Sequence, residues 1–123
     1  MKLVIDRAKW LHGESGGSSY LRRPVDGKMC CLGFYAEALG VCQGALDGVK
    51  MPRGLSTASK ALLPLWLLGS DSFEDVSWLS VFNDVYSGDT GLPEAIFSDL
   101  ERESKIAEYF AKHGVEVEFT GSY

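Results

Sequence analysis

The most apolar segment of helical length covers residues 28–40. Apolar side chains recur along it at intervals of three, four and seven residues, which places them on one face of a helix. Its only acidic residue is Glu37, so the helix is apolar on nearly all sides and belongs in the middle of a small domain. Gly40 is placed to end it. The apolar face is expected to hold Cys31, Phe34, Tyr35, Ala38 and Cys42.

Strand-like patterns stand at the two ends of the chain. Residues 2–5 read as a short strand with Leu3 and Ile5 on one face, and apolar and polar residues alternate in residues 115–119, as they do in half-buried strands. We expect the two segments to pair as a small antiparallel sheet that joins the N- and C-terminal strands. Lys2 is then placed to meet Glu116 or Glu118 across the sheet.

Two further helical segments are expected in the first half of the chain. Asp6 can cap a helix that runs to about residue 11, and Ser56 or Thr57 can start another. Pro64 should break that second helix or begin a new short one. The core positions expected in this region are Leu62, Leu63, Leu65, Trp66 and Leu67.

The second half is predicted to hold two longer helices. Residues 73–86 have apolar side chains at three- and four-residue spacing. Ser98 followed by Glu101 is a capping box, so a helix should start there and end before Gly114. Its apolar face is expected to hold Leu100, Ile106, Ala107 and Phe110.

Turn signals separate these elements. Asp26 and Gly27 predict a tight turn, and their flanks extend it to a β-hairpin at residues 20–30. Residues 41–59 are expected to be an irregular connection with a short helical turn. Other loops and turns are expected at residues 13–19, 69–72 and 87–91. The first of these loops is either a connector or a mobile lid.

These elements predict one predominantly helical α+β domain with about four to five helices and a small sheet. A chain of 123 residues buries enough surface to fold without a disulfide or a metal. The longest apolar run, residues 61–68, is far below the ~20 residues that span a bilayer. We expect no signal peptide. Three cysteines, two of them adjacent, leave a free thiol, which favours the reducing cytoplasm.

The net charge of −5 is unevenly distributed. Residues 1–60 hold nine Lys and Arg against five Asp and Glu, whereas residues 61–123 hold three against twelve. The acidic half either solvates the surface and pairs with the basic half, or presents a negative face to a basic partner. Direct nucleic-acid binding is disfavoured, because the basic patch of Arg22, Arg23 and Lys28 is small.

The cysteines and histidines are the first candidates for chemistry. Cys30 and Cys31 stand where the central helix begins, and His12 or His113 is the available base for a cysteine nucleophile. The alternative is that these thiols are buried core residues. We predict no metal site and no cofactor, because Cys42 and the other possible ligands lack the spacing of a zinc site.

Glu103 is expected in the middle of the apolar face of the last helix. A carboxylate there must pair with a cation, such as Arg7 or Arg22, or act as a general base or ligand anchor with a raised pKa. Asn83 and Asp84 commonly end helices by local hydrogen bonding. The tryptophans are either core residues or a ligand cage: Trp10, Trp66 and Trp78.

The chain contains no phosphate loop, dinucleotide fingerprint, serine elbow or metalloprotease motif. It does contain a characteristic series of short stretches, at residues 7–14, 19–21, 27–34, 63–67, 83–84 and 102–106. The most specific reads GKMCCLGF. Together these stretches resemble a family of small proteins encoded by bacteriophages and prophages. The resemblance implies an accessory protein made in the host cytoplasm during infection, and it assigns no activity or catalytic residue.

Three functions are therefore weighed. The first is a non-enzymatic binder that inhibits a host protein or a defence component such as a CRISPR protein. The second is a sponge for a nucleotide-type small molecule, and the third is a small enzyme using Cys30, Cys31 or Glu103. We expect no membrane partner, and a homodimer is compatible with the composition. The candidate binding residues are Arg22, Arg23, Trp10, Glu103 and Asp84.

Overall fold

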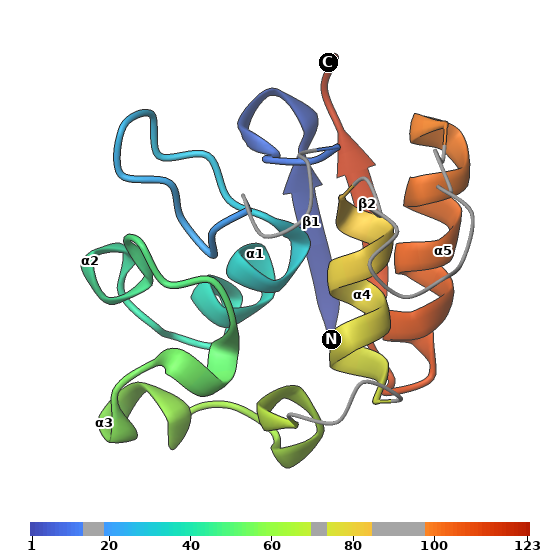
Figure 1. Cartoon of the computed structure of the whole chain (residues 1–123). Helices are drawn as coiled ribbons and strands as arrows, with labels where there is room; N and C mark the ends of the chain where they lie inside the picture. The colour runs from blue at the N-terminus through green and yellow to red at the C-terminus, as the bar shows by residue number, and fades with distance from the viewer. Residues whose placement is uncertain (14–18, 70–73, 85–97) are drawn as a thin grey trace, which may run out of the picture.

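The computed structural model of the chain describes residues 1–13, 19–69, 74–84 and 98–123 (Figure 1). Most of the loop expected at 13–19, most of the turn expected at 69–72 and all of the loop at 87–91 lie outside the described residues. The predicted helix at 73–86 lies partly outside them. What the structure describes is a mostly helical α+β fold, as the sequence predicts.

Five elements form the body of the fold (Figure 1). They are β1 (Lys2–Asp6), α1 (Cys31–Ala38), α4 (Asp75–Asn83), α5 (Asp99–Ala111) and β2 (Glu116–Thr120). Shorter helical pieces connect them: η1 (Arg7–Lys9), α2 (Gln43–Leu46), η2 (Pro52–Gly54), α3 (Thr57–Lys60) and η3 (Leu65–Leu68). Helix α1 packs on β1, α5 packs on β2, and α4 contacts both of these helices.

The two terminal strands lie side by side and join the ends of the chain. Their predicted antiparallel orientation is wrong, because β1 and β2 pair in parallel with Lys2 opposite Glu116 and Ile5 opposite Phe119. An alternating pattern shows which side chains face the core, but it does not show whether two strands run parallel or antiparallel. Almost the whole domain lies between the strands, which supplies the crossover that parallel pairing needs. The expected charge pair forms between Lys2 and Glu118 at 2.9 Å.

Helix α1 is the buried central helix, but it is shorter than the pattern predicts. Its first six residues, Cys31 to Ala36, are all buried. The chain turns away at Gly40, whose φ of +106° favours glycine. Cys42, beyond this turn, is exposed, and so is Ala38, the last residue of α1, so their predicted place on the apolar face is wrong.

The tight turn at Gly27 forms, with φ at +73°, but the predicted hairpin does not. Leu21 donates its N–H to the carbonyl of Val49, and Met29 pairs with residues 9–11. Two hydrogen bonds do join the arms, from the Arg23 N–H to the Lys28 carbonyl and from the Cys30 N–H to the Tyr20 carbonyl, but residues 20–30 form no strand. Turn signals fix where the chain reverses, whereas the choice of partner depends on tertiary packing.

Two helices predicted in the first half of the chain are shorter in the structure than the sequence predicts. Asp6 caps η1 by accepting from the Ala8 N–H, but this helix ends at Lys9. Ser56 caps α3, as predicted. Beyond Pro64 the chain forms the 3₁₀ helix η3, which has three residues per turn rather than 3.6. Because α3 ends at Lys60 and η3 begins at Leu65, no single helical face runs through this segment. Leu63 and Leu67 are buried, whereas Leu62 and Leu65, predicted in the core, are exposed.

Helix α5 has the predicted capping box, with Ser98 and Glu101 each bonding to the other's backbone N–H. It ends before Gly114, as predicted. Its buried face is Arg102, Ile106 and Phe110, at intervals of four residues. Leu100 was predicted on this face and is instead 80% exposed.

Candidate functional site

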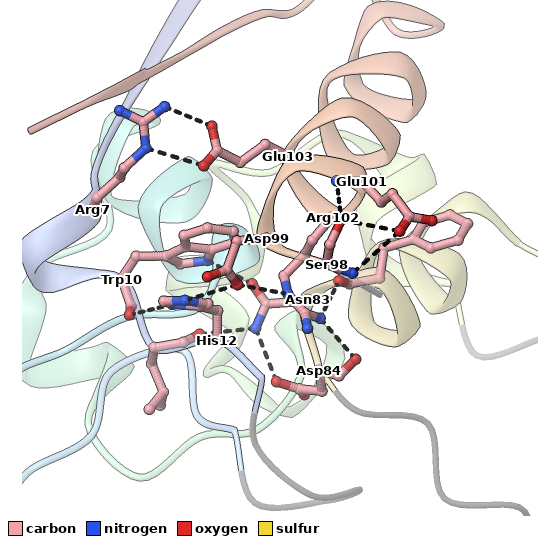
Figure 2. Close-up of polar contacts among 12 residues, drawn as sticks. Arg7, Trp10, His12, Asn83, Asp84, Ser98, Asp99, Glu101, Arg102 and Glu103 are labelled. Carbon is pink, nitrogen blue, oxygen red and sulfur yellow. Dashed lines mark hydrogen bonds and ion pairs between the residues drawn. The ribbon is translucent and has the colours of Figure 1, made fainter. Parts of the chain in front are cut away.

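The candidate site is built around Asn83, the last residue of α4, which is 1% exposed (Figure 2). Its side-chain oxygen accepts hydrogen bonds from Trp10 Nε1 at 2.8 Å and from the Cys31 N–H at 3.0 Å. Its nitrogen donates to the Leu11 carbonyl at 2.9 Å and to Asp84 Oδ1 at 3.1 Å. These bonds use all four hydrogen-bonding positions of the amide, so its orientation is fixed.

Asp84 follows directly and is 7% exposed. Its Oδ1 also accepts a hydrogen bond from the Ser19 hydroxyl. Behind it, Arg102 of α5 is 3% exposed and donates to the carbonyls of Asp84 and Phe82 at 3.0 and 2.9 Å (Figure 2). The guanidinium thereby satisfies carbonyl groups at the end of α4, where a cation is electrostatically favoured. Asp84 is therefore held both through its side chain and through its backbone carbonyl.

A second layer supports this arrangement (Figure 2). The His12 ring stacks on the Trp10 ring, with centroids 4.0 Å apart. Its Nδ1 lies 2.9 Å from the Trp10 carbonyl oxygen, and its Nε2 lies 3.4 Å from Asp99 Oδ1. Asp99 in turn lies 3.8 Å from Arg102 Nε. Polar contacts thus run from the end of η1 to both long helices.

A cavity of about 200 Å³ opens beside Asp84. Its polar lining comes from Ser19, Lys50, Ser80, Asn83 and Asp84. Its less polar lining comes from Cys30, Leu32 and Met51. A small concavity with a few convergent polar groups on an apolar floor is the usual form of a ligand site.

The adjacent thiols do not have the character of nucleophiles. Burial raises the pKa of Cys30 to about 12 and raises that of Cys31 well above 9.0, and the charge of Asp84 adds to both shifts. The two histidines are engaged elsewhere, His12 as described and His113 with Asp75 at 2.7 Å. The thiols are therefore protonated at neutral pH, and Cys30 presents a neutral surface to the cavity.

The predicted arginine and glutamate sites are occupied by ion pairs away from the cavity. Arg22 Nη1 lies 2.5 Å from Asp47, and Arg23 Nη2 lies 2.6 Å from Asp26. A hydrogen bond from Arg23 lowers the pKa of Asp26 to about 2. Of the five candidate binding residues, only Trp10 and Asp84 belong to the site.

Glu103 forms the structural pair expected of a carboxylate on that helix. Its two oxygens accept from Arg7 Nε and Nη2 at 3.0 and 2.7 Å, a bidentate geometry (Figure 2). The hydrogen bond raises the pKa of Arg7. The ring of Phe119 lies 5.9 Å from the Arg7 guanidinium carbon, which adds a cation–π contact. These contacts favour the structural role for Glu103 over the general-base role.

The three tryptophans are packing residues rather than a cage. Trp10 is 2% exposed. Trp66 stacks on the His113 ring with centroids 3.9 Å apart, and Trp78 stacks on Phe82 at 6.0 Å. Trp10 is in the core, whereas Trp66 and Trp78 are partly buried and pack against it with different partners.

Sequence reasoning missed the parts of the site that come from distant segments. Ser19, Lys50 and Ser80 have no local pattern that marks them. Arg102 does have one, because it stands four residues before Ile106 and eight before Phe110 on the buried face. That spacing identifies Arg102, rather than its neighbour Glu103, as the buried charge of α5.

Within the ranges that the structure describes, no cluster of three or more His, Cys, Asp or Glu residues is arranged to hold a metal ion. No helix in those ranges has the length and apolar character needed to cross a membrane. No protein-family model, curated protein or solved structure matches the chain.

Proposed function

We propose that this protein is a non-enzymatic binding protein that sequesters a small polar molecule in the cavity beside Asp84. The observation that carries the proposal is the convergence of polar side chains from separate segments on one cavity of about 200 Å³. A site of this kind binds well when its groups are held in place before the ligand arrives. Asn83 and Arg102 hold Asp84 in this way.

Binding is favoured over catalysis because the reactive groups near the site are engaged or protonated. The pKa of Cys30 is raised to about 12, so its thiolate is scarce at neutral pH. His12 is stacked on Trp10 and contacts Asp99. Glu103 is paired with Arg7. The contacts of His12 and Glu103 therefore favour structural roles for these two side chains.

The size and charge of the cavity favour a molecule smaller than a nucleotide. Drug-sized ligands occupy pockets of about 300–1,000 Å³, and this cavity measures about 200 Å³. Arginines that would hold phosphate groups are paired with carboxylates, Arg22 with Asp47 and Arg23 with Asp26. We therefore propose the sponge function for a compact polar metabolite.

The test is to purify the protein from bacterial lysate without denaturation, heat it and identify released small molecules by mass spectrometry. Asp84→Asn is the informative variant, because the amide keeps an acceptor for Ser19 and Asn83 while removing the charge. Glu108→Gln is the matched control, on an exposed residue paired with Lys105. We expect one compound in stoichiometric amount from the wild type and the control, and much less from Asp84→Asn. Equal release from all three, or none from the wild type, would contradict the proposal.

A second candidate is the binder of a host or defence protein that the resemblance to phage proteins implies. The observation in its favour is the outer face of the β1–β2 sheet, where Val4 is 48% exposed and Glu116 and Glu118 are exposed. Parallel sheets are normally covered on both faces. Glu118 on this face is paired with Lys2, so Glu116 is the carboxylate that suits a partner with a basic surface.

This candidate is tested by affinity capture of proteins from lysate with the wild type and with Glu116→Lys. The substitution reverses one exposed charge without touching the core. Lys105→Glu is a matched control on the exposed side of α5. Stoichiometric capture of a protein by the wild type and control, lost in Glu116→Lys, supports this function. Capture that is unchanged in Glu116→Lys counts against this surface.

A further inference from the structure

Two opposite charges line the cavity from different parts of the chain. Lys50 follows the α2 region, and Asp84 follows α4. Lys50 is exposed, and its Nζ lies 5.7 Å from the centroid of the Tyr20 ring. In the described part of the chain, Lys50 forms no ion pair with Asp84 or with any other carboxylate. The cavity therefore has a cationic rim and an anionic wall that do not neutralise each other by direct contact.

The Asp84 carboxylate is oriented by its neighbours. Ser19 and Asn83 both donate hydrogen bonds to Oδ1. A carboxylate offers about four acceptor positions, and its negative charge suits the ammonium group of a ligand. Hydrogen bonds between an ammonium group and a carboxylate are charge-assisted and stronger than neutral ones.

The remaining lining is nearly apolar. Leu32 is 1% exposed, Met51 lies partly buried beside it, and the Cys30 thiol is protonated. Methionine adapts its shape to different apolar groups. This floor suits a short aliphatic side chain, and the Ser80 hydroxyl adds one more hydrogen-bonding group.

We propose that the molecule bound in this cavity is a free α-amino acid, with its ammonium group at Asp84, its carboxylate at Lys50 and its side chain against Leu32 and Met51. A simple amine would meet Lys50 and a simple acid would meet Asp84, and both contacts are repulsive. A zwitterion replaces both repulsions with attractions. The cavity of about 200 Å³ has room for a small amino acid.

This inference rests on the proposed function and names the class of molecule that is sequestered. The test measures the thermal unfolding temperature and binding heat of the purified protein with each of the twenty common L-amino acids. Ethylamine and propionate are included because each carries one half of the charge pattern of L-alanine. We expect at least one amino acid to raise the unfolding temperature in a saturable way, and the single-charge compounds to leave it unchanged.

Two variants examine the two charges separately. Lys50→Met keeps the aliphatic stem and removes the ammonium group, and Asp84→Asn removes the negative charge. Each should weaken binding of the amino acid by about tenfold or more, because one charge-assisted contact is lost. Lys9→Met and Glu108→Gln remove one exposed charge of each sign outside the cavity, and binding should be retained. Since Lys50 is exposed, Lys50→Met keeps the test decisive even if Asp84→Asn fails to fold.

Other outcomes separate this inference from the proposed function. Binding of ethylamine or propionate as tight as that of any amino acid overturns the zwitterion assignment. A protein that binds no amino acid but still releases an Asp84-dependent compound on heating also overturns the zwitterion assignment. In that case the proposed sequestering function remains. If neither amino-acid binding nor an Asp84-dependent compound is found, both proposals fail.

Discussion

The indole nitrogen of Trp10 donates a 2.8 Å hydrogen bond to the side-chain oxygen of Asn83, a residue 73 positions further along the chain. Trp10 follows β1 and η1, whereas Asn83 ends α4. Both side chains are at most 2% exposed. The bond therefore ties the start of the chain to the end of α4 inside the core. It also fixes the position of Asn83, the residue directly before Asp84 in the cavity wall.

Replacement of Asn83 by Ala should destabilise the fold strongly. The change removes the acceptor of two buried donors, Trp10 Nε1 and the Cys31 N–H. A buried donor without an acceptor costs ~1–3 kcal/mol, so we expect a loss of about 2–4 kcal/mol in the free energy of unfolding. Urea denaturation followed by tryptophan fluorescence measures this change.

Asn83→Asp provides a more specific check of the same network. It keeps the oxygen that accepts from Trp10 but replaces the nitrogen that donates to Leu11 and Asp84. We expect a loss comparable with that of Asn83→Ala, because an ionised side chain would face two acceptors. A change below about 0.5 kcal/mol in both variants would show that the network contributes little.

The sequence predicts those parts of the fold that depend on local chemistry. The capping box spans only the four residues from Ser98 to Glu101, and the helix start predicted from it is confirmed. The pairing of Lys2 with Glu118 follows from two strands whose core faces are apparent from alternation. The pair of Arg7 with Glu103 is one of the alternatives that the sequence leaves open, because a carboxylate beside an apolar face requires a cation or a raised pKa.

The cavity could not be predicted, because its walls meet only after the chain has folded. Ser19, Lys50 and Asp84 are separated by at least 31 positions and carry no shared period. The parallel direction of β2 was missed for a related reason. It depends on how α5 packs and turns at Gly114, and alternation contains no information on direction.

The pair of Arg7 and Glu103 should contribute more to stability than an exposed pair on the same helix. Its side chains are 26% and 13% exposed, whereas those of Lys105 and Glu108 are 49% and 57% exposed. Solvent screens exposed pairs, so their coupling is small. In double-mutant cycles to Ala, we expect the larger coupling for Arg7 and Glu103.

A further variant separates charge from geometry in this pair. Arg7→Lys keeps the positive charge but cannot donate the two parallel hydrogen bonds. It should lose most of the coupling with Glu103. Equal couplings for the Arg7 and Lys105 pairs, or full retention in Arg7→Lys, would contradict the expected bidentate contribution.

The three cysteines should react with thiol reagents at different rates. Cys42 is exposed, whereas Cys30 and Cys31 are buried with raised pKa values. At pH 8 in the folded protein, we expect a disulfide-forming reagent to modify one thiol rapidly and the other two only in denaturant. Cys42→Ser should abolish the rapid phase. A rapid phase that survives in Cys42→Ser would show that Cys30 or Cys31 is accessible and reactive.

Asp26 should make stability depend on pH in the acidic range. The hydrogen bond from Arg23 holds the pKa of Asp26 at about 2, below its ordinary value of 3.8. The contribution of this carboxylate is therefore complete above pH 3.8 and is lost as the pH falls toward 2. Wild type and Asp26→Asn should differ in unfolding midpoint at pH 6 and converge near pH 2. A difference that does not change between these pH values would contradict this assignment.

Gly33, within the GKMCCLGF stretch, should be among the least replaceable residues of the chain. A Cβ atom at this position would lie 1.8 Å from the Leu21 carbonyl oxygen. The backbone at Leu21 cannot easily retreat, because its N–H is bonded to Val49 at 2.6 Å. We expect Gly33→Ala to lose more than about 2 kcal/mol of unfolding free energy or to prevent folding.

Gly44 is the matched control, since it lies in α2 and a Cβ there would have no neighbour within 4 Å. Gly44→Ala should leave stability unchanged or raise it by up to about 1 kcal/mol, because alanine favours the helix. Thermal unfolding of the two variants followed by circular dichroism provides the comparison. Equal stability of Gly33→Ala and Gly44→Ala would contradict the close approach of α1 to Leu21. The close approach of α1 to Leu21 therefore explains why this stretch has glycine at residue 33.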